Sequence, residues 1–196
     1  MKTKALFTSL LLLMAFSLYA QETTSEPVKR YGFKSAIAKV STDVMGQKVE
    51  STAYIDDYGA KECQKTKVTV PGVGEVESAS IVKDGKSWAV NYMYKQIQET
   101  TESLAGQPNF LNLDEETIKK FNIKEAGKGT ILDKECTIYT MENEVQVMKA
   151  EMKVWVYKGL AMKSETNISG MKLVGEMVEF EEGAMVLPQV FDLPKF

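Results

Sequence analysis

Apolar and polar residues alternate along most of this chain, and this period of two constrains the fold more than any other feature. Between residues 33 and 44, the even positions are mostly alanine or valine (Ala36, Ala38, Val40, Val44), and mostly polar residues alternate with them. The return run from Val49 to Ile55 alternates in the same way, and Met45-Gly46-Gln47 separates the two runs. Successive side chains of a strand point to opposite faces, so the pattern predicts antiparallel strands with one buried face. We expect a mainly β (α+β) fold with a single antiparallel domain over residues 31–196.

Turn residues mark out further strands. A third strand is expected from Ala60 to Val70, ending at Pro71, because proline lacks the N–H that pairing requires. Asp84-Gly85 lies between two β-prone runs and predicts a tight hairpin, since both central residues of a type I′ turn need positive φ. On the second strand of this hairpin, one face carries Trp88, Val90 and Tyr92.

The stretch from Val145 to Tyr157 fits either a strand or a helix. Its even positions form an unbroken apolar set that includes Met152, Val154 and Val156, and the letters VWVY are β-prone. We therefore interpret it as a strand. Turns at Lys158-Gly159 and Ser169-Gly170 then predict a three-stranded meander, and the proline-containing end of the chain is expected to cap one end of the core.

The alternation lapses in the middle of the chain. Residues 96–113 are mostly polar and predict a long connection. A short helix is expected over residues 114–122, with a capping box from Asn112 to Glu115. The next hairpin is expected to turn at Asp133-Lys134.

The first 20 residues have the order of a secretory signal peptide. Lys2 and Lys4 precede an apolar run that is shorter than the roughly 20 residues of a membrane-spanning helix, and a more polar stretch then ends at Ala20. We expect cleavage near Ala20, a flexible tail over residues 21–30, and a soluble periplasmic or secreted protein that does not span a membrane. The sequence has no cysteine near the cleavage point, so we expect no lipid anchor at a new N-terminal cysteine.

Several function classes lack the residues they need. The sequence has no histidine, which is the commonest general base and transition-metal ligand, and it contains no Gly-x-Ser-x-Gly motif. The net charge of −3 gives no electrostatic reason to bind nucleic acid. Cys63 and Cys136 form no Cys-x-x-Cys unit; they are either a disulfide or two buried thiols. We therefore expect no catalytic residue, no metal site and no cofactor.

Methionine and aromatic side chains recur on the predicted strand faces. They are consistent with an ordinary core, or with an apolar surface that adapts to ligands of varied shape. For the second interpretation, the expected lining residues are Trp88, Val90, Tyr92, Met152, Val154 and Val156.

The order of elements resembles that of exported Bacteroidota-type proteins and of the outer-membrane lipoprotein carrier superfamily (LolA/LolB-like). The resemblance is carried by YIDDYGAKE at 54–62, KDGKSW at 83–88, the stretch 113–139, KVWVYKGLAMKSE at 153–165 and LPQVFDLPKF at 187–196. It implies a curved antiparallel sheet, an unclosed half barrel, whose apolar concave side is covered by a short helix. In the carriers this concavity shelters lipoprotein acyl chains. No ligand-contacting motif of the carriers matches a position here, so the resemblance assigns no site residue.

Two functions follow as hypotheses. The first is an exported, non-catalytic binding or carrier protein for an apolar ligand, either a lipid or a lipoprotein acyl chain. The alternative is an envelope protein–protein interaction or scaffold module that uses its exposed strands or the 96–113 connection.

Overall fold

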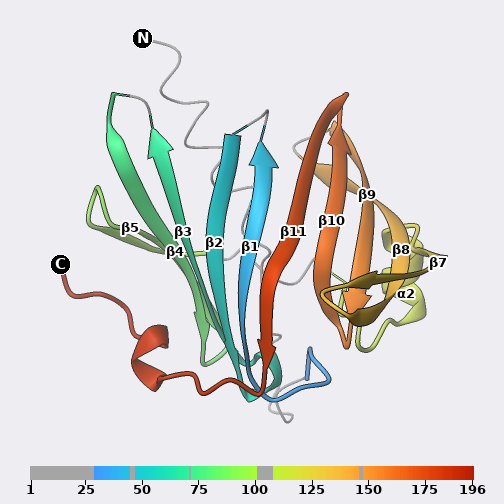
Figure 1. Ribbon diagram of the computed structural model, residues 1–196, viewed down its shortest axis with the longest axis horizontal. Coiled ribbons are helices and arrows are strands. Elements are labelled where there is room, and N and C mark those ends of the chain that lie inside the picture. The colour runs from blue at the N-terminus through green and yellow to red at the C-terminus, as the bar shows by residue number, and fades with distance from the viewer. Residues whose placement is uncertain (1–28, 45–46, 71, 101–107, 146–147) are drawn as a thin grey trace.

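The computed structural model describes residues 29–44, 47–70, 72–100, 108–145 and 148–196, with side chains described outside 143–149. The described residues form one antiparallel sheet of eleven strands, which is curled and unclosed (Figure 1). The strands are β1 (Ala36–Val44), β2 (Gln47–Asp56), β3 (Lys61–Val70), β4 (Gly74–Lys83), β5 (Lys86–Asn91), β6 (Gln96–Glu99), β7 (Lys124–Ile131), β8 (Lys134–Val145), β9 (Met148–Tyr157), β10 (Leu160–Ile168) and β11 (Met171–Glu182). Short helical segments are η1 (Asp57–Gly59), α2 (Glu115–Lys120) and η2 (Pro188–Phe191).

The sheet consists of two meanders joined in the middle. Its order is β6-β5-β4-β3-β2-β1-β11-β10-β9-β8-β7, so all strands that lie side by side are consecutive in sequence except β1 and β11. Strands β6 and β7 are the two edges. The expected curved antiparallel sheet is confirmed, and the chain between its edges passes through α2 (Figure 1).

The strongest turn and strand predictions are confirmed. Asp84 and Gly85 have φ of 53° and 75°, as the tight hairpin between β4 and β5 requires. Of the ambiguous stretch, Met148–Tyr157 is strand β9 and forms the expected meander with β10 and β11; Val145 ends β8, and residues 146–147 lie outside the described residues. The β7–β8 turn lies one residue earlier than predicted, because Leu132 and Asp133 have the positive φ values.

Two local predictions are wrong. The residues expected to open a long connection instead form the edge strand β6, which pairs with β5 although all four of its residues are exposed. Helix α2 is capped by Asp114, whose carboxylate accepts a 2.6 Å hydrogen bond from Thr117 N, and not by Asn112. The aspartate immediately precedes the first helical residue, so its side chain reaches the free N–H groups directly.

Parts of the N-terminal predictions lie outside the described residues. These parts are the signal peptide 1–20, residues 21–28 of the tail, the turn at 45–46 and residue 71; residues 101–107 of the predicted connection are also outside the described residues. The end of the predicted tail is held in place: Arg30 N donates to Tyr58 O at 3.0 Å, and Asn109 Nδ2 donates to Lys29 O at 3.2 Å. Residues 29 and 30 of the predicted tail therefore contact the rest of the domain.

The strand register divides the side chains between two faces. Val154 is opposite Ser164, and the same row continues through Gly175 and Thr42 to Val49 on β2. We call this side of the sheet the Val154 face. Trp88 is opposite Ile81, and its row continues through Cys63 to Tyr54 on β2. Val49 and Tyr54 have opposite parity on one strand, so the second row lies on the other side, which we call the Trp88 face.

Three apolar clusters hold the domain together. The first packs Tyr31 and Phe33, which precede β1, against β1, β2, β10 and β11. The second lies on the Trp88 face of β3–β5, where Phe191 of the C-terminal segment inserts beside Cys63 and Ile81. The third joins the residues that flank α2 to Met141. The expected packing of the chain end on the core is thus confirmed, with η2 contacting β3 and β4.

Candidate functional site

Charged side chains are few on the Val154 face over most of the sheet, and those on β7, β8 and β11 lie on the edge strand or near strand ends: Glu125, Lys128, Glu135 and Glu182. On β1–β6, and on β9 and β10 wherever side chains are described, the register places one charged residue there, Glu62. The lysines of β3 all have the opposite parity and lie on the Trp88 face: Lys61, Lys65 and Lys67. Because an isolated charge is costly to remove from water, a face free of charges is suited to contact with apolar groups.

One half of the Val154 face is aliphatic. It comprises β1, β2 and β8–β11, and its side chains are mostly alanine, valine, isoleucine and methionine. Val154 is 2% exposed, and Ala150, Val156 and Ile168 are also buried. We call this region the apolar half; it includes the predicted lining residues Met152, Val154 and Val156.

The other half of the Val154 face is polar but uncharged. Gln64 and Thr66 on β3 are opposite Ser80 and Ser78 on β4, and all four are half-buried. Gln64 Nε2 donates a 3.1 Å hydrogen bond to Ser51 Oγ on β2. Together with Ser87 on β5, the residues Gln64, Thr66, Ser78 and Ser80 form what we call the polar stripe.

Glu62 lies beside the polar stripe at the end of β3 that is close to the N-terminal segment. Its carboxylate accepts a 3.2 Å hydrogen bond from Tyr31 Oη and lies 3.6 Å from Arg30 Nη1. Burial raises the pKa of Glu62 to about 8, and the guanidinium of Arg30 and the Tyr31 hydroxyl oppose this shift without cancelling it. The buried carboxyl therefore fastens the start of the domain to β3.

A short segment covers the apolar half next to β8 and β9. Phe121 and Ile123 pack with Met141, and Phe110 and Leu113 pack around them. Helix α2 has no buried residue of its own, so the covering contacts come from the residues that flank it. We call residues 108–123 the cover segment. Lifting it would expose the apolar side chains of β8 and β9.

The register separates the six predicted lining residues into two groups of three. Met152, Val154 and Val156 lie on the Val154 face, whereas Trp88 and Val90 lie on the opposite side of the sheet. Tyr92 packs with that second group, and its ring meets Phe196 with centroids 6.0 Å apart. The C-terminal segment covers all three residues of the second group. The structure therefore brings together only the β9 residues as parts of one uncharged surface.

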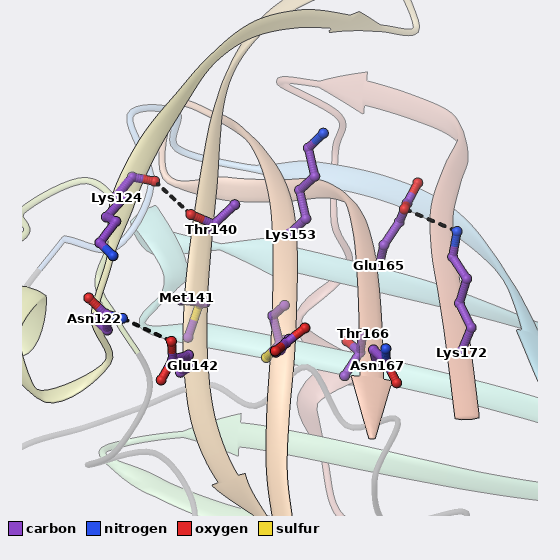
Figure 2. Close-up of a pocket in the computed structure, with 12 residues that line it drawn as sticks. Asn122, Lys124, Thr140, Met141, Glu142, Lys153, Glu165, Thr166, Asn167 and Lys172 are labelled. Carbon is purple, nitrogen blue, oxygen red and sulfur yellow. Dashed lines mark hydrogen bonds and ion pairs between the residues drawn. The ribbon is translucent and has the colours of Figure 1, made fainter. Parts of the chain in front are cut away.

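A cavity of about 460 Å3 lies over β8–β10 between Asn122, Lys124 and Lys172 (Figure 2). Half of its lining residues are charged, and some of them pair with one another across the cavity. Asn122 Nδ2 donates to Glu142 Oε1 at 2.9 Å, and Lys172 Nζ lies 3.2 Å from Glu165 Oε2. Met152 contributes to the lining, but a wall of lysine and glutamate does not suit an apolar ligand. We therefore place the candidate site on the Val154 face and not in this cavity.

The cysteines and acids provide no reactive centre among the described residues. Cys63 and Cys136 are free, buried thiols in different apolar clusters, and burial raises the pKa of Cys63 to about 11. No group of three potential metal ligands occurs in the described part of the chain. None of the described helices is long and apolar enough to cross a membrane.

Comparison with known proteins gives the fold but no family. No family model and no curated protein matches the sequence. An uncharacterised conserved protein from Thermus thermophilus is similar in structure, with a TM-score of 0.53, 12% identity, and coverage of 86% of this chain and 90% of that one. MucB has a TM-score of 0.51 and 10% identity, over 85% of this chain and 59% of MucB. The Mycobacterium tuberculosis lipoprotein LppX has a TM-score of 0.44 and 10% identity, over 79% of this chain and 90% of LppX.

Proposed function

We propose that this protein is an exported, non-catalytic binding protein that carries an apolar ligand, such as a lipid or lipoprotein acyl chain. The proposal includes removal of the signal peptide near Ala20 and a soluble protein in the periplasm or outside the cell. The observation that carries it is the Val154 face of an unclosed sheet: half of this face is mostly aliphatic, and over β1–β6, β9 and β10 its described side chains include one charged residue.

The proposed ligand lies on the apolar half, under the cover segment. Phe121 and Ile123 occupy this surface beside Met141 and Met152. They flank a helix that has no buried residue of its own, so their displacement breaks mainly the contacts with Met141 and Met152 and the 2.8 Å hydrogen bond from Glu142 N to Phe121 O. An acyl chain that replaces these side chains makes apolar contacts with the same surface in their place. Local opening of the cover segment would let the acyl chain reach this surface.

Matched substitutions on β9 test the proposal. Met152 and Lys153 are neighbours on one strand but lie on opposite faces, so Met152→Gln and Lys153→Gln place the same amide on the two sides of the sheet. We expect Met152→Gln to weaken binding of a fluorescent fatty acid by about tenfold, because an unpartnered amide against an apolar chain costs about 1–3 kcal/mol. Lys153→Gln should leave the affinity within about twofold.

Circular dichroism establishes that both variants fold. A second measurement is mass spectrometry of lipids extracted from residues 21–196 purified from the periplasm. Protein that yields no lipid and binds no fluorescent fatty acid would contradict the proposal. Equal weakening by the two substitutions would place the ligand elsewhere.

An envelope interaction module is the second candidate, and it is favoured by exposed apolar side chains on the C-terminal segment. Met185 is 87% exposed and Leu187 is 60% exposed, close to each other in sequence. Crosslinking in envelope fractions should recover one stoichiometric partner with the wild-type protein and lose it with Met185→Ser/Leu187→Ser. Absence of such a partner from the wild-type sample argues against this role.

A further inference from the structure

The Val154 face carries a polar region, the polar stripe, beside its apolar half. Its two cross-strand pairs, Thr66 with Ser78 and Gln64 with Ser80, bring hydroxyl and amide groups together on β3 and β4. Both β3 and β4 lie in the same sheet as the aliphatic strands, and β2 and β1 connect the two regions. From β3 to β9 there are five inter-strand steps of about 4.8 Å, or about 24 Å in all, which is the length scale of a long acyl chain with its head group.

Several hydroxyl groups of the stripe are free to bond to something else. Thr66, Ser78 and Ser80 make no side-chain hydrogen bond to any described residue. Ser87 is 6% exposed, and its buried Oγ has no hydrogen-bond partner in the described part of the chain. A buried hydroxyl without a partner is energetically costly, and a ligand hydroxyl that bonded to it would remove that cost.

The charges around the stripe indicate which head group it accepts. On β3–β5 the lysines lie on the Trp88 face, so these strands offer no lysine on this side to neutralise a carboxylate or phosphate, and the nearby cation, Arg30, is already paired with Glu62. Glu62 is the one acid, and Tyr31 and Arg30 already engage it. An ionised head group would therefore lose hydration without gaining a counter-charge, whereas an uncharged head group would not.

We infer that the ligand is an amphipath with an uncharged, hydroxyl-bearing head group, which the polar stripe binds while the apolar half holds the chain. This inference rests on the proposed function and specifies the class of ligand. It assigns Thr66, Ser78 and Ser80 to recognition of the head group through hydrogen bonds, and it assigns the β9 residues to contact with the chain.

Three ligands with the same acyl chain test the inference: a monoacylglycerol, the fatty acid methyl ester and the free carboxylate. We expect the monoacylglycerol to bind about tenfold more tightly than either of the others, as one or two additional hydrogen bonds would give. Thr66→Val keeps the shape of the side chain and removes its hydroxyl, so it should reduce this preference to about threefold or less without changing affinity for the methyl ester.

Thr69→Val is the matched control. Thr69 is on the same strand as Thr66, but its parity places it on the Trp88 face, where it is exposed. It should retain the full preference for the monoacylglycerol. If all three ligands bind equally, or if the carboxylate binds best, the head-group inference is wrong and the proposed function stands. If none of the three binds, the proposed function itself fails.

Discussion

Phe191 is expected to be a major stabilising residue, although it lies close to the end of the chain. Its ring is 2% exposed and packs against Cys63, Ile81 and Val90 on the Trp88 face. A buried phenylalanine removes roughly 200 Å2 from water, worth about 5 kcal/mol at about 25 cal/mol per Å2. Measured phenylalanine-to-alanine substitutions in cores cost about 3–5 kcal/mol. We expect Phe191→Ala to lower the free energy of unfolding by that amount.

Leu187 provides the matched control because it belongs to the same segment but is 60% exposed. Leu187→Ala should change the free energy of unfolding by less than about 0.5 kcal/mol. For a domain of this size, about 3–5 kcal/mol corresponds to a fall of roughly 6–20 °C in Tm. Urea denaturation followed by circular dichroism measures both variants.

Cys63 gives the same substitution a second, local readout. The thiol lies under the Phe191 ring and is 1% exposed, and its raised pKa further slows reaction. Phe191→Ala should therefore accelerate modification of Cys63 by Ellman's reagent under native conditions, while Cys136 in the other cluster stays protected. A cost below about 1 kcal/mol together with an unchanged rate at Cys63 would refute the packing of the C-terminal segment on this face.

Three further predictions concern single positions. Gly159→Ala should lower the free energy of unfolding, measured by urea denaturation, by more than about 2 kcal/mol, because the added Cβ would meet the Arg30 carbonyl. Gly170 has almost the same φ but open space around it, so Gly170→Ala should lower it by about 1 kcal/mol. Equal losses in the two variants would contradict the contact at Gly159. Between pH 4.5, the ordinary pKa of glutamate, and about pH 8, the native protein retains the Glu62 proton and the unfolded chain releases it. The free energy of unfolding should therefore fall as pH rises through this window. Glu62→Gln should flatten this pH profile, and an unchanged slope in the variant would disprove the assignment. Asp114→Ala should destabilise the protein by about 1 kcal/mol and Asn112→Ala by much less; the reverse order would restore the cap expected from the sequence.

The sequence predicted the strands because their side chains obey a local rule. Alternation within β9 distinguished it from a helix, and the positive φ demanded by Asp84-Gly85 positioned a hairpin. Edge strand β6 was not predicted because its side chains do not follow this rule. All of its residues are exposed, so burial imposes no alternation on them, and its backbone pairing with β5 leaves no trace in residue type.

The candidate site was only half predictable. Parity shows that Trp88 and Val90 share a face, and that Met152, Val154 and Val156 share a face, but it does not relate two strands that are far apart in the chain. That relation depends on the register of every intervening pair and on the β1–β11 junction. The C-terminal segment adds a second apolar surface on the side opposite the site, so apolar character alone did not distinguish a ligand surface from an internal contact.

The central claim is that an apolar ligand occupies the apolar half of the Val154 face. A fatty acid carrying a photoreactive diazirine, crosslinked to residues 21–196 and located by sequencing of the labelled peptides, tests it directly. The account predicts labels at alternate positions of β9 and β10, including Met152, Val154 and Ile168, which share the Val154 face. Labels at Lys153 or Glu165, or beside Trp88 under the C-terminal segment, would contradict it.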